Sequence, residues 1–251
     1  MIWVDINCDL GEGVGNDAAV MPYISSANIA CGYHAGDKAT MDQTLQMTIQ
    51  NNVGAGAHPG FNDPENFGRV AQNLTGAEIE QLVSKQINIL QDRASTAGCR
   101  LTHVKPHGAL YNMAAADYKV ALAIAWGIYT INPKLFYYGL ANSPMLQAAH
   151  EVGLTAVSEV FADRAYSNNG QLVSRKQSGA VIHDVELCKE RVLGMVLNQT
   201  VESIEGNQIP IQADTICIHG DNPEAVELAK AIHDVLVEND IQIVSPTSPM
   251  L

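Results

Sequence analysis

Positive charge is scarce in this sequence: its 251 residues include 14 Lys and Arg against 27 Asp and Glu, for a net charge of −13. A surface this acidic repels nucleic-acid phosphates and anionic lipids, so we expect neither nucleic acid nor a membrane as a partner. Long hydrophobic runs are also lacking, because the longest apolar stretch, 120–131, is too short to cross a bilayer. The first residues carry no basic segment or small-residue cleavage site of a secretory signal, so we expect a cytoplasmic protein.

Cysteine is sparse, and its spacing excludes two kinds of site. The five cysteines include no Cys-x-x-Cys pair and are Cys8, Cys31, Cys99, Cys188 and Cys217. An odd, scattered set argues against a disulfide framework or a thiolate zinc site, and favours a reducing compartment. Familiar catalytic motifs are missing as well. The glycine-rich segment 11–15 matches neither the dinucleotide fingerprint nor a P-loop, and no Gly-x-Ser-x-Gly elbow occurs.

What the chain does contain is an alternation of short apolar runs and helical stripes. Runs suited to buried strands occupy 2–6, 27–31, 53–57, 101–105, 135–138, 155–160 and 215–218, with a weaker one at 241–244. No linker interrupts them, so 1–251 is predicted to be a single domain. Seven or eight strand–helix repeats indicate a parallel α/β fold. At this length we favour an irregular (β/α)7–8, TIM-like barrel over an open doubly wound sheet, although periodicity alone leaves both open.

Polar residues gather where the predicted strands end. Such residues lie within or just after six of the runs and are Asp5, Asn7, Asp9, Glu12, His34, His58, His103, Lys105, His107, Tyr111, Glu159, Arg164 and His219. Alternation along the first strand places Asp5, Asn7 and Asp9 on one face. Because parallel α/β folds bind ligands at the carboxyl ends of their strands, these residues define the candidate site.

Several of these polar residues also have a purely structural interpretation. Helix-start signals occur at Asp37, Thr75-x-x-Glu78, Ser143-Pro144 and Asn222-Pro223. Asp37 and Asp221 or Asn222 are thus candidate caps. His103 is better explained as a hydrogen-bonded interior residue than as a catalyst, and Asp5 as readily as a buried structural carboxylate. His150, His183 and His233 fall in helical or connecting segments and are assigned to the surface or to packing.

The candidate site combines three kinds of chemistry. Carboxylates beside histidines can supply a general acid and a general base. Lys105 and Arg164 can hold a carboxylate or phosphate group. Two histidines with one carboxylate can also bind a divalent metal, for which Asp9, His34 and His58 are the candidates, although no His-Glu-x-x-His spacing is present.

Taken together, the segments around these residues resemble the LamB/YcsF family. Six blocks carry the resemblance, in order: NCDLGE (7–12), ANIACGYHAGD (27–37), GAHP (56–59), VKPHGALYN (104–112), EVFADRAY (159–166) and IHGDNP (218–223). The resemblance implies ATP-dependent opening of 5-oxo-L-proline to L-glutamate with two partner subunits, B and C. It also implies an irregular barrel of the glycoside hydrolase/deacetylase type. A homo-oligomer is compatible with the sequence.

The resemblance also suggests roles for the site residues. A five-membered lactam is a poor electrophile, and phosphorylation of its amide oxygen, which we expect to depend on the partner subunits, would make ring opening feasible. The expected roles are anion binding by Lys105 and Arg164, water activation by Asp9 or Glu12, and protonation of the ring nitrogen by His58, His107 or His219. His34 and Glu159 complete the catalytic candidates, and Asn7 and Tyr111 the substrate-binding ones.

Two other functions remain open at this stage. One is a metal-dependent amidase or deacetylase that acts alone. The other is a non-catalytic subunit that only delivers substrate to B and C.

Overall fold

Seven parallel strands close into a barrel in the order in which they occur along the chain. The structure, a computed structural model, describes residues 2–218 and 225–246. The barrel strands are β1 (Trp3–Leu10), β2 (Ser26–Ala30), β3 (Gly54–His58), β4 (Leu101–Val104), β5 (Phe136–Leu140), β6 (Ala156–Phe161) and β9 (Thr215–Ile218). β1 closes the barrel because Asn7 lies opposite Ser26 of β2 and Asp5 lies opposite Thr215 of β9. The predicted closed barrel is therefore confirmed, and the open sheet is excluded.

The first strand is longer than the sequence pattern predicts. The apolar run covers 2–6, but the strand continues to Leu10, and its residues stay buried or nearly buried to that point. Asp5, Asn7 and Asp9 do share the face that points into the barrel. The weaker run at 241–244 forms β10 (Gln242–Ile243), which among the described strands pairs only with the start of β1 and takes no part in closure.

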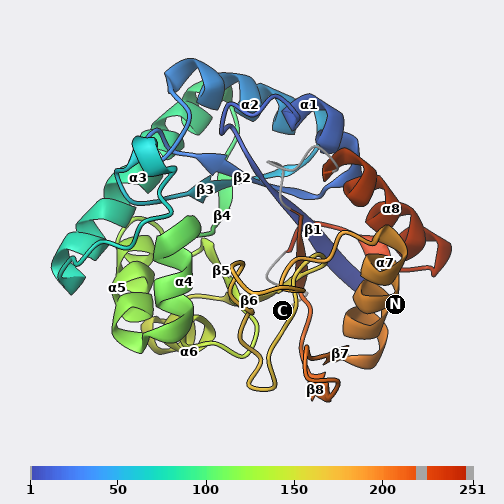
Figure 1. Cartoon of the computed structure of the whole chain (residues 1–251). Helices are drawn as coiled ribbons and strands as arrows, with labels where there is room; N and C mark the ends of the chain where they lie inside the picture. Colours follow the sequence, from blue (N-terminus) through green and yellow to red (C-terminus); the bar gives the residue numbers. More distant parts are fainter. Residues whose placement is uncertain (1, 219–224, 247–251) are drawn as a thin grey trace.

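Helices surround the strands, as Figure 1 shows in a view down the barrel. They are α1 (Asp17–Val20), α2 (Lys38–Asn51), α3 (Gly76–Ala97), α4 (Gly108–Ala116), α5 (Tyr118–Tyr129), α6 (Pro144–Val152), α7 (Val185–Leu193) and α8 (Ala225–Glu238). Leu45, Val83, Ile87, Ile124 and Ile232 are fully buried members of the large apolar core that these helices and the strands enclose. The large apolar core thus lies outside the barrel wall. A smaller buried cluster of Phe136, Tyr138 and Val157 is separate from it, and Tyr138 of that cluster donates to Asp5 among the polar side chains of the interior.

The helix-start signals are confirmed wherever the structure describes them. Thr75 and Glu78 form a reciprocal capping box at the start of α3. The Asp37 carboxylate accepts a hydrogen bond of 2.8 Å from the Thr40 amide and caps α2, so its structural interpretation is confirmed. Ser143 caps α6 in the same way. The Asn222-Pro223 signal, together with His219 and Asp221, lies outside the described residues.

Between β6 and β9 the chain makes an excursion that the sequence pattern does not predict. Strands β7 (Thr200–Glu202) and β8 (Gln208–Pro210) pair antiparallel as a separate two-stranded sheet. Short turns of other helix types occupy Met21–Tyr23, Pro64–Asn66 and Gly194–Asn198. Within the described ranges, we find no helix with the length and apolar character needed to span a membrane.

Candidate active site

A cavity of about 700 Å³ opens at the carboxyl ends of the barrel strands. Its lining includes seven of the predicted site residues: Asp9, Glu12, His58, Lys105, His107, Tyr111 and Arg164. They come from β1 and β3, from the segments after β1, β4 and β6, and from α4, so a single end of the barrel collects them. The sequence-based expectation that these residues lie together is met.

Lys105 is the central cation of the site. Its buried ammonium group donates to Asp9 Oδ1 at 3.1 Å and to Asn7 Oδ1 at 3.0 Å, and lies 2.8 Å from Glu159 Oε1. Burial by itself lowers the pKa of Lys105, but Asp9, the Cys217 sulfur and Glu159 more than offset this and raise it well above its usual range. Lys105 is therefore charged and neutralises carboxylates on two strands.

An asparagine that the sequence analysis did not single out orients the first strand's polar face. Asn28 on β2 donates from Nδ2 to Asn7 Oδ1 at 2.7 Å and to Asp9 Oδ1 at 2.8 Å. Its own oxygen lies 2.8 Å from Nε2 of the fully buried His103. Burial, followed by the Lys105 charge, lowers the pKa of His103 to about 3. His103 is thus the neutral interior residue that the sequence indicated.

Four residues beside this network converge on one point. Glu12 Oε1 lies 3.4 Å from His107 Nδ1, 3.5 Å from His34 Nε2 and 3.9 Å from His58 Nε2. The four ligand-type atoms all lie within 4.8 Å of one another, so the group could hold a metal ion. This group differs from the predicted metal set, because Glu12 and His107 join His34 and His58. Asp9 contacts the group from one side, with Oδ2 3.3 Å from His58 Nε2.

Backbone carbonyls orient two of the three histidines. His58 Nδ1 lies 2.7 Å from the Lys105 oxygen, and His107 Nε2 lies 2.8 Å from the Phe67 oxygen. Burial, followed by the neighbouring His58, lowers the pKa of His107 to about 3. Burial and the neighbouring imidazoles also lower the pKa of His34 well below its usual range. At neutral pH the His34 and His107 rings are therefore uncharged.

Glycines allow the histidines to pack this closely. Gly68 has a φ of +63°, and a Cβ atom there would lie 2.8 Å from the His34 Cβ. A Cβ at Gly60 would lie 2.7 Å from His34 Nδ1. Larger residues at either position would displace His34 from its stacked contact with His107, in which the ring centroids are 3.8 Å apart.

The remaining predicted residues take different places. Tyr111 is buried beside Glu159, and burial first and that carboxylate second raise the pKa of its hydroxyl. Arg164 lines the cavity, but it donates to the main-chain oxygens of Val173 and Ala180 and so organises the segment after β6. His34 belongs to the histidine cluster and is buried, yet it is not among the described residues that line the cavity.

Three basic residues that the sequence analysis did not place in the site also line the cavity: Arg69, Arg175 and Lys176. With Lys105 and Arg164 they make five of the chain's 14 basic residues. In a chain of net charge −13, this concentration makes the cavity a candidate binding site for an anion.

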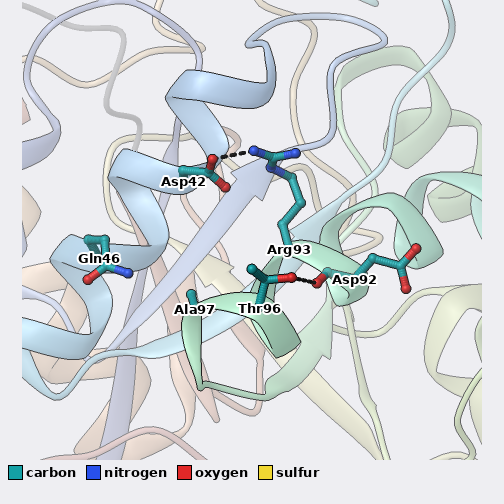
Figure 2. A pocket seen from close by; sticks show the side chains of 6 residues that line it. All are labelled: Asp42, Gln46, Asp92, Arg93, Thr96 and Ala97. Atoms are coloured by element: carbon teal, nitrogen blue, oxygen red, sulfur yellow. Dashed lines mark hydrogen bonds and ion pairs between the residues drawn. The ribbon is translucent and has the colours of Figure 1, made fainter.

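A second hollow, of about 410 Å³, lies between α2 and α3 (Figure 2). Its lining contains the ion pair between Asp42 and Arg93, and Thr96, which bonds to the main chain of Asp92. The charged groups of Asp42 and Arg93 are paired with each other across a helix–helix contact. We therefore assign this hollow to the packing of the two helices.

Fold and site together define a class: a parallel α/β barrel with a carboxylate, histidine and lysine site at the carboxyl ends of its strands. A sequence model of the LamB/YcsF family matches residues 4–250, and the chain belongs to that family.

The relatives of this chain are similar over almost their whole length. It is 48% identical to a protein of Natranaerobius thermophilus that is named as the A subunit of 5-oxoprolinase, over 96% of each chain. It is 47% identical to a protein of Bacillus thuringiensis subsp. konkukian with the same name, over 98% of this chain and 100% of the relative. The crystal structure of a lactam utilization protein from Thermus thermophilus superposes with a TM-score of 0.93 at 37% identity, covering 98% of this chain and 100% of that one.

Proposed function

We propose that this chain is the lactam-opening subunit of an ATP-dependent 5-oxoprolinase, which converts 5-oxo-L-proline to L-glutamate together with partner subunits B and C. The names of its full-length relatives support the substrate and the role within a complex. The observation that carries the proposal is the cavity itself, where carboxylates, imidazoles and basic side chains surround a space large enough for a small cyclic amide.

The reaction needs a base for water and an acid for the ring nitrogen. Water adds to the lactam carbonyl carbon, the C–N bond breaks, and the nitrogen takes up a proton to become the amine of glutamate. Asp9 or Glu12 accepts the proton from water in this scheme, and His58 or His107 carries a proton to the nitrogen. His219, the third candidate acid, lies outside the described residues.

ATP enters the proposal through the complex. Phosphorylation of the lactam oxygen would make the carbonyl carbon electrophilic and would turn that oxygen into a leaving phosphate. We assign this step to the complex with B and C. Lys105, Arg164 and the basic residues Arg69, Arg175 and Lys176 would give the carboxylate and phosphate groups of the activated substrate a favourable potential.

The test is glutamate formation from 5-oxoproline and ATP by purified B and C, with and without this chain. We expect glutamate only when all three are present. One of the relatives named above serves as the comparison subunit. If B and C work with that relative but not with this chain, the proposed function is wrong.

A stand-alone metal-dependent amidase is the second candidate, and the convergence of Glu12 with three histidines favours it. It predicts chelator-sensitive hydrolysis of simple amides or lactams by this chain alone. A non-catalytic substrate-delivery role predicts instead that variants of Asp9 and His107 keep the turnover of the complex and lose only substrate affinity.

A further inference from the structure

The protons on His58 and His107 can be placed from their main-chain partners. A carbonyl oxygen can only accept a hydrogen bond, so His58 must carry its proton on Nδ1, facing the Lys105 oxygen. By the same argument His107 carries its proton on Nε2, facing the Phe67 oxygen. When both rings are neutral, the other two ring nitrogens, His58 Nε2 and His107 Nδ1, carry no proton, and they lie only 2.9 Å apart.

Two lone pairs at this distance repel each other unless a positive charge lies between them. Two nearby carboxylates make a positive charge at this point still more favourable. Glu12 Oε1 is 3.4 Å from His107 Nδ1 and 3.9 Å from His58 Nε2. Asp9 Oδ2 is 3.3 Å from His58 Nε2. The edge of a tetrahedron with metal–ligand bonds of about 2.0–2.1 Å is about 3.3 Å long. The three edges joining Glu12, His58 and His107 measure 2.9, 3.4 and 3.9 Å and scatter around that length.

His34 is close enough to be a fourth ligand, but its ring orientation excludes it. The His34 and His107 rings are stacked, with planes only 6° apart. A metal ion lies near the plane of each imidazole that binds it, and one ion cannot lie in two stacked parallel planes. Neither ring nitrogen of His34 has a hydrogen-bond partner among the described residues, and Nε2 faces Glu12 Oε1 at 3.5 Å. His34 is therefore a positioning residue for Glu12.

We propose that Glu12, His58 and His107 bind one Zn²⁺ ion, through Oε1, Nε2 and Nδ1 respectively. Two imidazoles and one carboxylate form an ordinary three-residue zinc site that leaves a position for water or substrate. All three residues line the cavity, so that position is accessible to a ligand. Metal-binding histidines usually donate their second N–H to an outer acceptor, and the Lys105 and Phe67 carbonyls fill that role. This assignment makes Glu12, His58 and His107 ligands instead of acid–base groups and leaves Asp9 as the base of the scheme above. The zinc site itself does not depend on whether the chain opens a lactam.

The test uses the isolated chain and no substrate. The protein is stripped with a chelator, titrated with Zn²⁺ against a competing indicator, and analysed for metal after gel filtration. We expect one equivalent of Zn²⁺ per wild-type chain. His58→Gln and His107→Gln should each lower the affinity by more than the roughly 10–100-fold typical of losing an outer partner. His150→Gln, on the exposed side of α6, is the matched control and should bind like wild type.

Two further measurements keep the proposal falsifiable if a variant fails to fold. In the wild-type chain, Zn²⁺ should shift the ¹⁵N resonances of His58 Nε2 and His107 Nδ1 and leave the His34 nitrogens nearly unchanged. His34→Gln should keep one equivalent of Zn²⁺. Absence of saturable binding by the wild type would overturn the site and would mean that a proton supplies the missing charge. Loss of binding in His34→Gln equal to that in His107→Gln would overturn the ligand assignment.

Discussion

Asp5 and Asp9 are carboxylates on the same face of β1, yet their surroundings differ completely. Asp5 lies deep in the barrel and accepts hydrogen bonds from the hydroxyls of Ser25, Ser26, Tyr138 and Thr215. Asp9 lies two residues after Asn7 on β1, where it contacts Lys105 and lines the cavity. Burial raises the pKa of Asp5, although the four hydroxyl contacts partly offset this.

The comparison shows that depth along a strand decides what a carboxylate does. Asp5 has its hydrogen bonds filled by neutral groups that hold β1, β2, β5 and β9 together. Asp9 faces a charged amine and an imidazole at the open end. The barrel interior is thus divided into a structural layer and a reactive layer, and mutations in the two layers should have different consequences.

The largest effect is expected from Lys105→Met. The substitution leaves Asp9 and Glu159 facing each other without their shared cation. Loss of one partner of a buried ion pair costs about 3–5 kcal/mol, so urea denaturation should show a decrease of that size in the free energy of unfolding. Turnover of the complex should be lost as well. A stability equal to that of wild type would contradict the central position of Lys105.

Asp9→Asn should separate catalysis from folding. The amide keeps the oxygen that accepts from Lys105 and Asn28 but is a far weaker base, so turnover of the complex should fall by about 10²–10⁴-fold. Its melting temperature should stay close to that of wild type. Near-normal turnover would remove Asp9 from the mechanism.

Asp5→Asn is the matched substitution in the structural layer. In the wild type four hydroxyls donate to the Asp5 carboxylate, and the NH₂ group of the variant cannot accept those hydrogen bonds. We expect this to lower the free energy of unfolding by about 1–3 kcal/mol. Turnover per folded molecule should change less than about threefold, because no reacting group is removed. If the variant folds normally but loses turnover as Asp9→Asn does, the division into two layers is wrong.

The buried neutral histidines predict a dependence of stability on pH. The folded-state pKa of His107 is about 3, below the unfolded value near 6.5, so the unfolded chain takes up a proton first as the pH falls. The contribution of His107 to the free energy of unfolding is therefore largest above pH 6.5. It falls by about 1 kcal/mol as the pH is lowered from 6.5 to 5.5. Urea denaturation in the presence of a chelator should show a smaller decrease for His107→Gln than for wild type.

The smallest effect concerns the exposed part of the cavity lining. Arg175→Gln should raise the KM for 5-oxoproline by at most about fivefold, because an exposed charge contact is worth up to about 1 kcal/mol. Arg100→Gln, an exposed arginine just before β4, is the control and should leave KM unchanged. An equal effect of both substitutions would indicate a general influence of net charge, not a contact in the cavity.

Much of the fold and the site could be predicted from local pattern. The alternation that places Asp5, Asn7 and Asp9 on one face follows directly from strand geometry. The capping box at Thr75 needs only four residues of sequence. The convergence of His58, Lys105 and His107 follows from the rule that parallel strands present their carboxyl ends together.

Other parts could not be predicted, because they depend on contacts between distant segments. Asn28 orients Asn7 and Asp9 only because β2 lies beside β1 in this register. Arg175 and Lys176 line the cavity because the segment after β6 folds back over it. No periodic pattern in the sequence predicts that this segment folds back. The stacking that separates His34 from the cavity depends on Gly60 and Gly68, whose role is visible only in three dimensions.

The position of β1 at the junction of the barrel has a consequence for synthesis on the ribosome. Asp5 pairs with Thr215, which is made 210 residues later, and Asn7 pairs with Cys217 of the same strand. A nascent chain therefore holds the polar face of β1 without the strand that completes it, and such long-range pairing is slow to form. Residues made early must wait for β9, so the barrel around the active centre cannot close until β9 has left the ribosome.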